Sequence, residues 1–156
     1  MMIGIRTVND VIEKGYLWLS WFWIVGFSVY DIRYRRVPDR ALFIFSVYAF
    51  WRPFIEMKIT GQTALSAFGS SLAGAAAGFL IMLFAAMISG RKNGVGGGDI
   101  KLTAVIGYLY GAYRLGGILV TASLLAVLWG PLGKRPVSVP FVPFLAAGSF
   151  LMMFAT

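Results

Sequence analysis

The chain has 156 residues, of which 59% are hydrophobic and only 13% are charged, about half the charged share of a soluble domain, so lipid is the expected solvent. Its net charge of +8 comes from short basic clusters between apolar runs, which argues against nucleic acid as a partner. Cysteine and histidine are absent, which excludes disulfides, thiolate metal sites and a histidine base, so we expect carboxylate chemistry without a metal or cofactor.

Six apolar runs separated by polar connections predict an all-α polytopic membrane helix bundle, with residues 1–156 as a single membrane-embedded domain. The predicted spans cover residues 15–30, 41–54, 63–89, 100–113, 115–129 and 139–155. Several are shorter than the roughly 20 residues that a span needs, so we expect them to tilt or to be shielded by neighbours. The polar segment before them lacks a signal-peptide cleavage site, and we expect it to be retained at the membrane interface.

The basic residues predict the orientation of the bundle. Most of them flank the connections after the first, third and fifth spans: Arg33, Arg35, Arg36, Arg40, Arg91, Lys92, Lys101, Lys134 and Arg135. Lysine and arginine gather in the cytoplasmic loops of membrane proteins, so these three connections should face the cytoplasm. Both termini would then lie outside, in a multi-pass protein of the cell's inner membrane.

Small residues in the third span predict close helix packing. Gly74 and Gly78 form a G-x-x-x-G pair among alanines and serines, a composition that lets two helix backbones approach each other. We expect this face to pack inside the bundle. A homodimer through the same face is the alternative.

Only six carboxylates occur in the chain, and three of them fall on the predicted cytoplasmic side. Asp31 ends the first span, Asp39 precedes the second and Asp99 begins the fourth. An ionisable group at the membrane boundary is costly, so each is a candidate functional residue. The other three, Asp10, Glu13 and Glu56, lie in segments assigned to the outer side, where solvation explains them.

Asp31 and Asp99 are expected to occupy opposite ends of helices. At the C-terminal end of a helix, burial and the helix dipole disfavour a charge on Asp31, whereas nearby arginines favour it. The alternative role of Asp31 is a simple ion pair with Arg33, Arg35 or Arg36.

Asp99 opens a helix after three glycines, where the dipole favours its charge. Gly96, Gly97 and Gly98 can let another backbone approach, or can adopt backbone angles closed to other residues. Helix capping is the alternative role of Asp99.

Two carboxylates in such different environments are suited to aspartyl hydrolysis. One must be ionised to take a proton from the attacking water, and the other protonated to donate to the carbonyl oxygen and the leaving amine. We assign Asp99 as the base from its dipole environment, although a close pair titrates as a unit. Asp39 follows Pro38 and is expected to cap the next helix, whereas Lys101 is expected to offset charge near Asp99 or to bind lipid phosphate.

Three motifs then appear in order: D-x-x-x-x-x-V-P-D at 31–39, G-G-G-D-I-K-L at 96–102 and V-P-F-V-P-F-L-A at 139–146. Over nearly the whole chain they resemble the type IV prepilin peptidases, membrane aspartyl peptidases that remove the cytoplasmic leader from prepilins, with relatives that act on preflagellins. The resemblance implies that Asp31 and Asp99 are the catalytic pair and that the substrate is prepilin-like or preflagellin-like.

Two departures from the family's pattern qualify that resemblance. Val142 stands where the family's last motif usually has glycine, at a site that we expect to be structural. Larger members also carry an N-terminal region, often with paired cysteines, associated with methylation of the new pilin terminus. This chain has neither, so its likeness to the short, peptidase-only members implies cleavage without methyl transfer.

Three rival functions remain from the sequence. A presenilin-like protease also uses a glycine-rich aspartate motif, but the V-P-D segment argues against it. A small anion transporter could use the glycine loop at a helix N-terminus, yet Asp99 would repel the anion there. A non-catalytic pilus-assembly protein would need the aspartates only for ion pairs.

Overall fold

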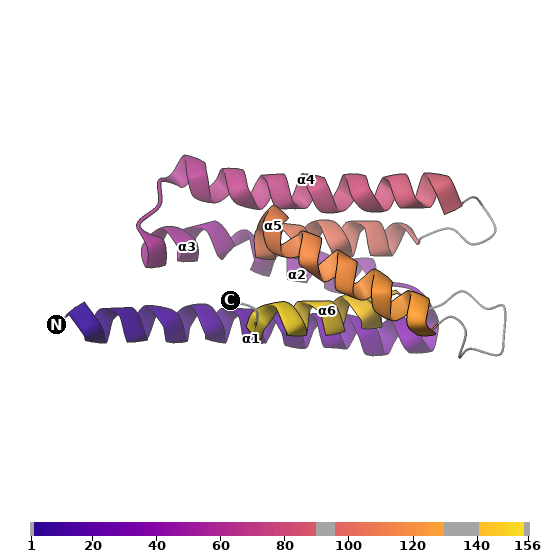
Figure 1. Ribbon diagram of the computed structural model, residues 1–156, viewed down its shortest axis with the longest axis horizontal. Helices are drawn as coiled ribbons and strands as arrows, with labels where there is room; N and C mark the ends of the chain where they lie inside the picture. Colours follow the sequence, from indigo (N-terminus) through magenta and orange to yellow (C-terminus); the bar gives the residue numbers. More distant parts are fainter. Residues whose placement is uncertain (1, 90–95, 130–140, 155–156) are drawn as a thin grey trace.

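The computed structural model describes residues 2–89, 96–129 and 141–154, and among these it contains helices and no strand (Figure 1). The helices are α1 (Met2–Tyr34), α2 (Asp39–Phe50), α3 (Arg52–Thr60), α4 (Ala64–Ser89), α5 (Gly97–Trp129) and α6 (Val142–Phe154). The all-α prediction is therefore confirmed. Four of the basic residues on which the predicted orientation depends lie outside the described residues: Arg91, Lys92, Lys134 and Arg135.

Two helices differ in length from the predicted spans. α1 is continuous from Met2 to Tyr34, so the polar N-terminal segment extends the first predicted span as one long helix. The second predicted span is interrupted at Trp51, where α2 ends and α3 begins. The reason is Pro53 in the first turn of α3, because proline has no N–H to donate to the preceding turn.

α5 contains a reversal that separates its two halves. Gly111 has φ 76° and ψ 165°, a conformation that breaks the helix and that suits glycine. Figure 1 shows the second half turning back from this point, drawn in orange. The sequence predicts a break at Tyr113-Arg114, so the break exists but lies two to three residues earlier.

With that reversal, successive segments run in alternating directions through the bundle. The ends of α1, α4 and α5 lie at one end of the molecule, together with the starts of the helices that follow them (Figure 1). These are the three junctions for which the sequence predicts a cytoplasmic location. Their side of the membrane stays a prediction, because only an experiment on the protein in its membrane can test it.

α4 and the first half of α5 pack backbone to backbone through glycine. A Cβ on Gly74 would collide with the backbone of Gly107, and one on Gly78 would lie 2.6 Å from the carbonyl oxygen of Thr103. The predicted close packing of this glycine pair is confirmed. The face is filled by α5 of the same chain, which leaves no room on it for a second copy.

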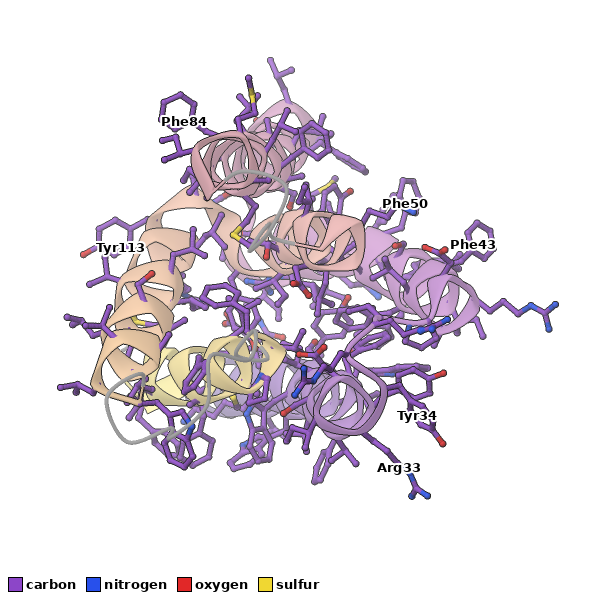
Figure 2. The ribbon with its side chains drawn as sticks, turned by 90° about the vertical axis from the view of Figure 1, so that its right-hand side faces the viewer. Arg33, Tyr34, Phe43, Phe50, Phe84 and Tyr113 are labelled. Atoms are coloured by element: carbon purple, nitrogen blue, oxygen red, sulfur yellow. The ribbon has the colours of Figure 1, made fainter. Side chains whose placement is uncertain are left out.

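The surface of the bundle is rich in large apolar side chains. Phe43, Phe50, Phe84 and Tyr113 project outward around it (Figure 2), with exposed fractions of 71%, 54%, 65% and 92%. α4 and α5 are each long and apolar enough to cross a membrane. Since α5 contains two of the six predicted spans, on either side of Gly111, the number of spans stays a prediction.

Candidate active site

Asp31 lies in the last turn of α1 and is buried, with 5% of its surface exposed. The backbone N–H of Val142, the first residue of α6, donates a hydrogen bond to its carboxylate. Its Oδ2 atom is also buried and has no hydrogen-bond partner among the described residues. Burial raises the pKa of this carboxyl, against the opposing effects of the Val142 N–H and the charge of Arg35. A buried acid with one free oxygen is suited to holding or exchanging a proton.

The arginines that follow Asp31 do not form an ion pair with it in the described part of the chain. The Arg35 backbone N–H donates to the carbonyl oxygen of Asp31 at 2.7 Å, and Arg35 itself has φ 51°. This left-handed residue ends α1 and turns the chain toward α2. Arg35 therefore acts on the Asp31 carboxylate through its charge, without the ion pair that was the alternative role.

Asp99 is the third residue of α5 and is partly buried. Its carboxylate accepts a hydrogen bond from the backbone N–H of Gly96 and lies within electrostatic range of Asp31. A side chain that reaches back to the residue before a helix is half of a capping box, so the capping alternative is met in part. The same carboxylate nevertheless faces a second one, which capping does not require.

Gly98 and Val37 bring the two motifs into contact. A Cβ added to Gly98 would lie 2.9 Å from Cβ of Val37 and 3.3 Å from its backbone nitrogen. Val37 is 8% exposed and belongs to the turn between α1 and α2. The start of α5 can therefore approach the end of α1 only because residue 98 has no side chain. The expected role of the glycines in close approach holds at this position.

Gly96 and Gly97 contribute differently from Gly98. An added Cβ would meet nothing within 4 Å at Gly97, and at Gly96 only the Asp99 carboxylate, 3.4 Å away. Among the described residues, positive φ angles at glycine occur only at Gly61 and Gly111. The alternative that the three glycines adopt unusual backbone angles is therefore wrong.

Asp39 and Lys101 form a separate ion pair on the surface. Lys101 Nζ lies 2.9 Å from Asp39 Oδ1, with both side chains well exposed. Asp39 does not cap α2, because Pro38 occupies the N-cap position and no side chain bonds the free N–H groups there. That capping prediction was wrong. Lys101 pairs with Asp39, and its two expected roles, at Asp99 and at lipid phosphate, stay predictions. The pair still links the V-P-D motif to α5.

Two contributors to this site were missed from the sequence. Val142 was noted only as a departure from a motif, yet its N–H bonds the Asp31 carboxylate. A backbone donor leaves no trace in residue identity, so only the recurrence of a motif at its position could have drawn attention to it. Val37 was quoted within V-P-D without a role, although it contacts Gly98.

Known proteins are similar to this chain over most of its length. Residues 16–131, which include both aspartates, match the model of the type IV leader peptidase family. The chain is 39% identical over 131 residues to "Prepilin leader peptidase/N-methyltransferase" of Bacillus subtilis (strain 168), covering 80% of this chain and 49% of the relative. It is 28% identical over 157 residues to the protein of the same name in Dichelobacter nodosus, covering 92% and 49%.

A third relative carries a different name. The chain is 26% identical over 141 residues to "Type 4 prepilin-like proteins leader peptide-processing enzyme" of Escherichia coli O78:H11 (strain H10407 / ETEC), covering 85% of this chain and 48% of the relative. The chain thus spans about half the length of the curated relatives it matches. No solved structure matches it.

Proposed function

Because this chain belongs to the type IV leader peptidase family, we propose that it is an aspartic endopeptidase that removes the leader from prepilin-like or preflagellin-like proteins. Membership of a leader peptidase family confirms the resemblance drawn from the three motifs. The observation that carries the aspartic mechanism is the meeting of Asp31 and Asp99 at one end of the bundle. The relatives' names supply the substrate class, and the geometry supports the chemistry.

The proposed reaction uses both carboxyls and one water molecule. The ionised carboxylate takes a proton as water attacks the scissile carbonyl carbon, and the protonated carboxyl donates to the carbonyl oxygen. As the C–N bond breaks, the amine leaving group takes a proton from the pair, and one hydroxyl of the tetrahedral intermediate returns a proton to it, so the other product is a carboxylic acid. The dyad returns to its starting state with one proton, so no metal or cofactor is part of the proposal.

The single proton belongs to the pair as a whole. Burial raises the pKa of both carboxyls, and together with the charge of Asp31 it raises the pKa of Asp99 to about 6, against the hydrogen bond from the Gly96 N–H. The charge of each carboxylate opposes that of the other, so the two titrate together. The helix dipole predicted Asp99 as the base, but the raised pKa of Asp99 opposes that assignment, so we propose a pair that shares one proton with neither role assigned.

We place the reaction at the cytoplasmic boundary of the inner membrane, in a bundle of six spans with both termini outside. This proposal rests on the basic residues of the three junctions at the aspartate end and on the exposed apolar side chains around the bundle. Single cysteines at positions 35, 91 and 134 test it, because the chain contains none of its own. They should resist an impermeant thiol reagent added outside, and strong labelling at all three would reverse the orientation.

An apolar hollow beside Asp31 supports a place for the substrate's membrane helix. It has a volume of about 330 Å³ and lies between α1 and α2, where Phe22, Gly26, Tyr30 and Pro38 are among the lining residues. Tyr30 lies in the same turn of α1 as Asp31, so one wall of the hollow comes from the end of the helix that carries this aspartate. We propose that the apolar segment following the leader docks there while the scissile bond reaches the aspartates.

The proposal covers leader cleavage without N-methylation. The second activity named in two of the relatives is not carried over, since the chain matches those proteins over about half of their length. Adding a labelled methyl donor to the cleavage reaction tests this part. Transfer of label to the new pilin N-terminus would contradict it.

The central experiment is cleavage of a prepilin by the purified chain. A prepilin with a short basic leader ending in glycine should give a leader-sized shift in mobility, and mass spectrometry should place the cut after the glycine. A transporter or an assembly scaffold gives no such product. Intact prepilin after prolonged incubation with folded protein would reject the proposed function.

A further inference from the structure

A polar cavity lies at the opposite end of the bundle from the aspartates. Its volume is about 480 Å³, within the range of small-molecule sites, and α1, α3, α4 and α5 all contribute to its walls. The lining includes two arginines, two glutamates and a buried tyrosine: Arg52, Arg114, Glu13, Glu56 and Tyr110. Neither the proposed peptidase reaction nor the three motifs involves any of them.

Arg52 is the most deeply buried charge at this end, with 6% of its side chain exposed. Its Nε donates to the carbonyl oxygen of Leu109 at 3.0 Å, and its Nη2 lies 3.4 Å from Glu13 Oε1. The same Glu13 oxygen lies 3.8 Å from Nη1 of Arg114. One carboxylate therefore serves two guanidinium groups, and Nη1 of Arg52 has no partner among the described residues.

Tyr110 supplies a second donor of the same kind. Its hydroxyl is buried and unpartnered among the described residues, and the residue as a whole is 5% exposed. A buried donor without an acceptor costs roughly 1–3 kcal/mol, so two such donors on residues that line one cavity favour a ligand that accepts hydrogen bonds. The unpaired groups at this end are thus donors, in contrast to the free carboxylate oxygen of Asp31.

The break in α5 adds backbone donors to the same cavity. The second half of the helix begins after Gly111, and Ala112, Tyr113 and Arg114 all line the cavity. The first N–H groups of a helix have no partner within it and favour a bound anion. Helix start, Arg52 and Tyr110 together form a donor set suited to phosphate.

The charges that line the cavity and its place in the bundle further restrict the class of ligand. Glu13 and Glu56 offset the two arginines, so a free anion gains little, whereas a phosphate carrying its own amine can also satisfy Glu56. Tyr113 beside the cavity is 92% exposed and projects from the bundle (Figure 2), as aromatic residues do at the depth of lipid headgroups. We infer that this cavity binds the headgroup of a zwitterionic phospholipid, with its phosphate at Arg52 and Tyr110.

Ligand-dependent thermal stability of the purified, delipidated full chain tests the inference. Short-chain phosphatidylethanolamine should raise Tm in a saturable way. It should also bind more tightly than matching phosphatidylglycerol or inorganic phosphate. Tyr110→Phe removes only a hydroxyl that has no partner among the described residues, so the variant should fold, and its affinity for the lipid should fall about tenfold. Tyr108→Phe, on the same helix but outside the cavity, is the matched control and should bind normally.

Two results would overturn the inference. One is phosphatidylglycerol or inorganic phosphate binding as tightly as phosphatidylethanolamine, which would show no preference for a zwitterion. The other is unchanged lipid affinity in Tyr110→Phe. Arg52→Lys, which keeps a charge but loses the guanidinium fork, gives a second test wherever it folds, and it should weaken binding at least as much as Tyr110→Phe.

Discussion

The bundle carries a polar cluster at each end, and the two are built on opposite electrostatic principles. At one end, like charges meet: Asp31 and Asp99 lie within each other's field, and a buried oxygen of Asp31 has no partner. At the other end, opposite charges meet, because Glu13 lies between Arg52 and Arg114. The first arrangement costs stability and prepares a proton transfer, whereas the second compensates charge and holds helices together.

The comparison predicts its largest effect at the aspartates. Asp31→Asn and Asp99→Asn should each reduce prepilin cleavage by about 10²- to 10⁴-fold, because asparagine keeps the size but cannot exchange a proton. Neither change should lower Tm, since each removes one of two repelling carboxylates. Initial cleavage rates and thermal unfolding of the purified proteins check both statements.

Asp39→Asn is the matched control for those two variants. Asp39 is an exposed acid paired with Lys101, so its loss should leave most of the cleavage activity. An inactive Asp39→Asn together with an active Asp31→Asn would show that the wrong aspartates were paired.

The next effect concerns how the two carboxylates are brought together. Gly98→Ala places a methyl group 2.9 Å from Cβ of Val37 and should push the start of α5 away from α1. A displacement of this kind at a catalytic pair should slow cleavage by about ten- to a hundredfold. Gly97→Ala meets nothing within 4 Å and should cleave at the normal rate. Equal cleavage rates for the two variants would show that cleavage does not depend on the close approach of Gly98 to Val37.

The opposite end should respond in stability. Glu13→Gln removes the carboxylate shared by two arginines and leaves the buried Arg52 without its counter-charge, so we expect a loss of about 1–2 kcal/mol. Thermal unfolding in one detergent measures it as a fall of Tm. Glu56→Gln lines the same cavity without an ion pair among the described residues and should unfold near the normal temperature. A Tm fall as large in Glu56→Gln would mean that the shared carboxylate has no special role.

The smallest effect is expected in the hollow between α1 and α2, where we propose that the substrate docks. Gly26→Leu fills part of the hollow between α1 and α2, where an added Cβ meets nothing within 4 Å. It should raise KM for prepilin several-fold and leave kcat nearly unchanged, because it obstructs docking rather than chemistry. Gly69→Leu is equally open but lies on α4, away from the hollow, and should leave both constants normal.

Local sequence signals predicted much of the fold, and contacts distant in sequence account for most of the errors. The third predicted span, 63–89, agrees with α4 to within one residue, because a long uncharged apolar run has few alternatives. The break in α5 was predicted at Tyr113-Arg114, between two apolar runs. In the structure Arg114 lies near Glu13, and the break falls at Gly111. No local signal could have predicted that partner.

The candidate site shows the same division. The choice of Asp31 and Asp99 rested on where carboxylates fall relative to apolar runs, and their catalytic role stays a prediction. The roles of Val37 and Val142 depend on a side-chain contact with Gly98 and on a backbone N–H, neither of which residue type encodes. The wrong capping role of Asp39 had a local cause, because Pro38 already occupies the capping position.

The hydrogen bond from Val142 to Asp31 also bears on the order in which the protein is made. The ribosome reaches α6 long after α1 has left it, so a nascent chain that already holds both aspartates still lacks this donor. α6 then lies against α1, where Trp21 Nε1 donates to the carbonyl oxygen of Ala146 at 3.1 Å. The surroundings of Asp31 are thus complete only when synthesis has passed α6. A chain that stops earlier lacks the Val142 N–H that bonds the Asp31 carboxylate.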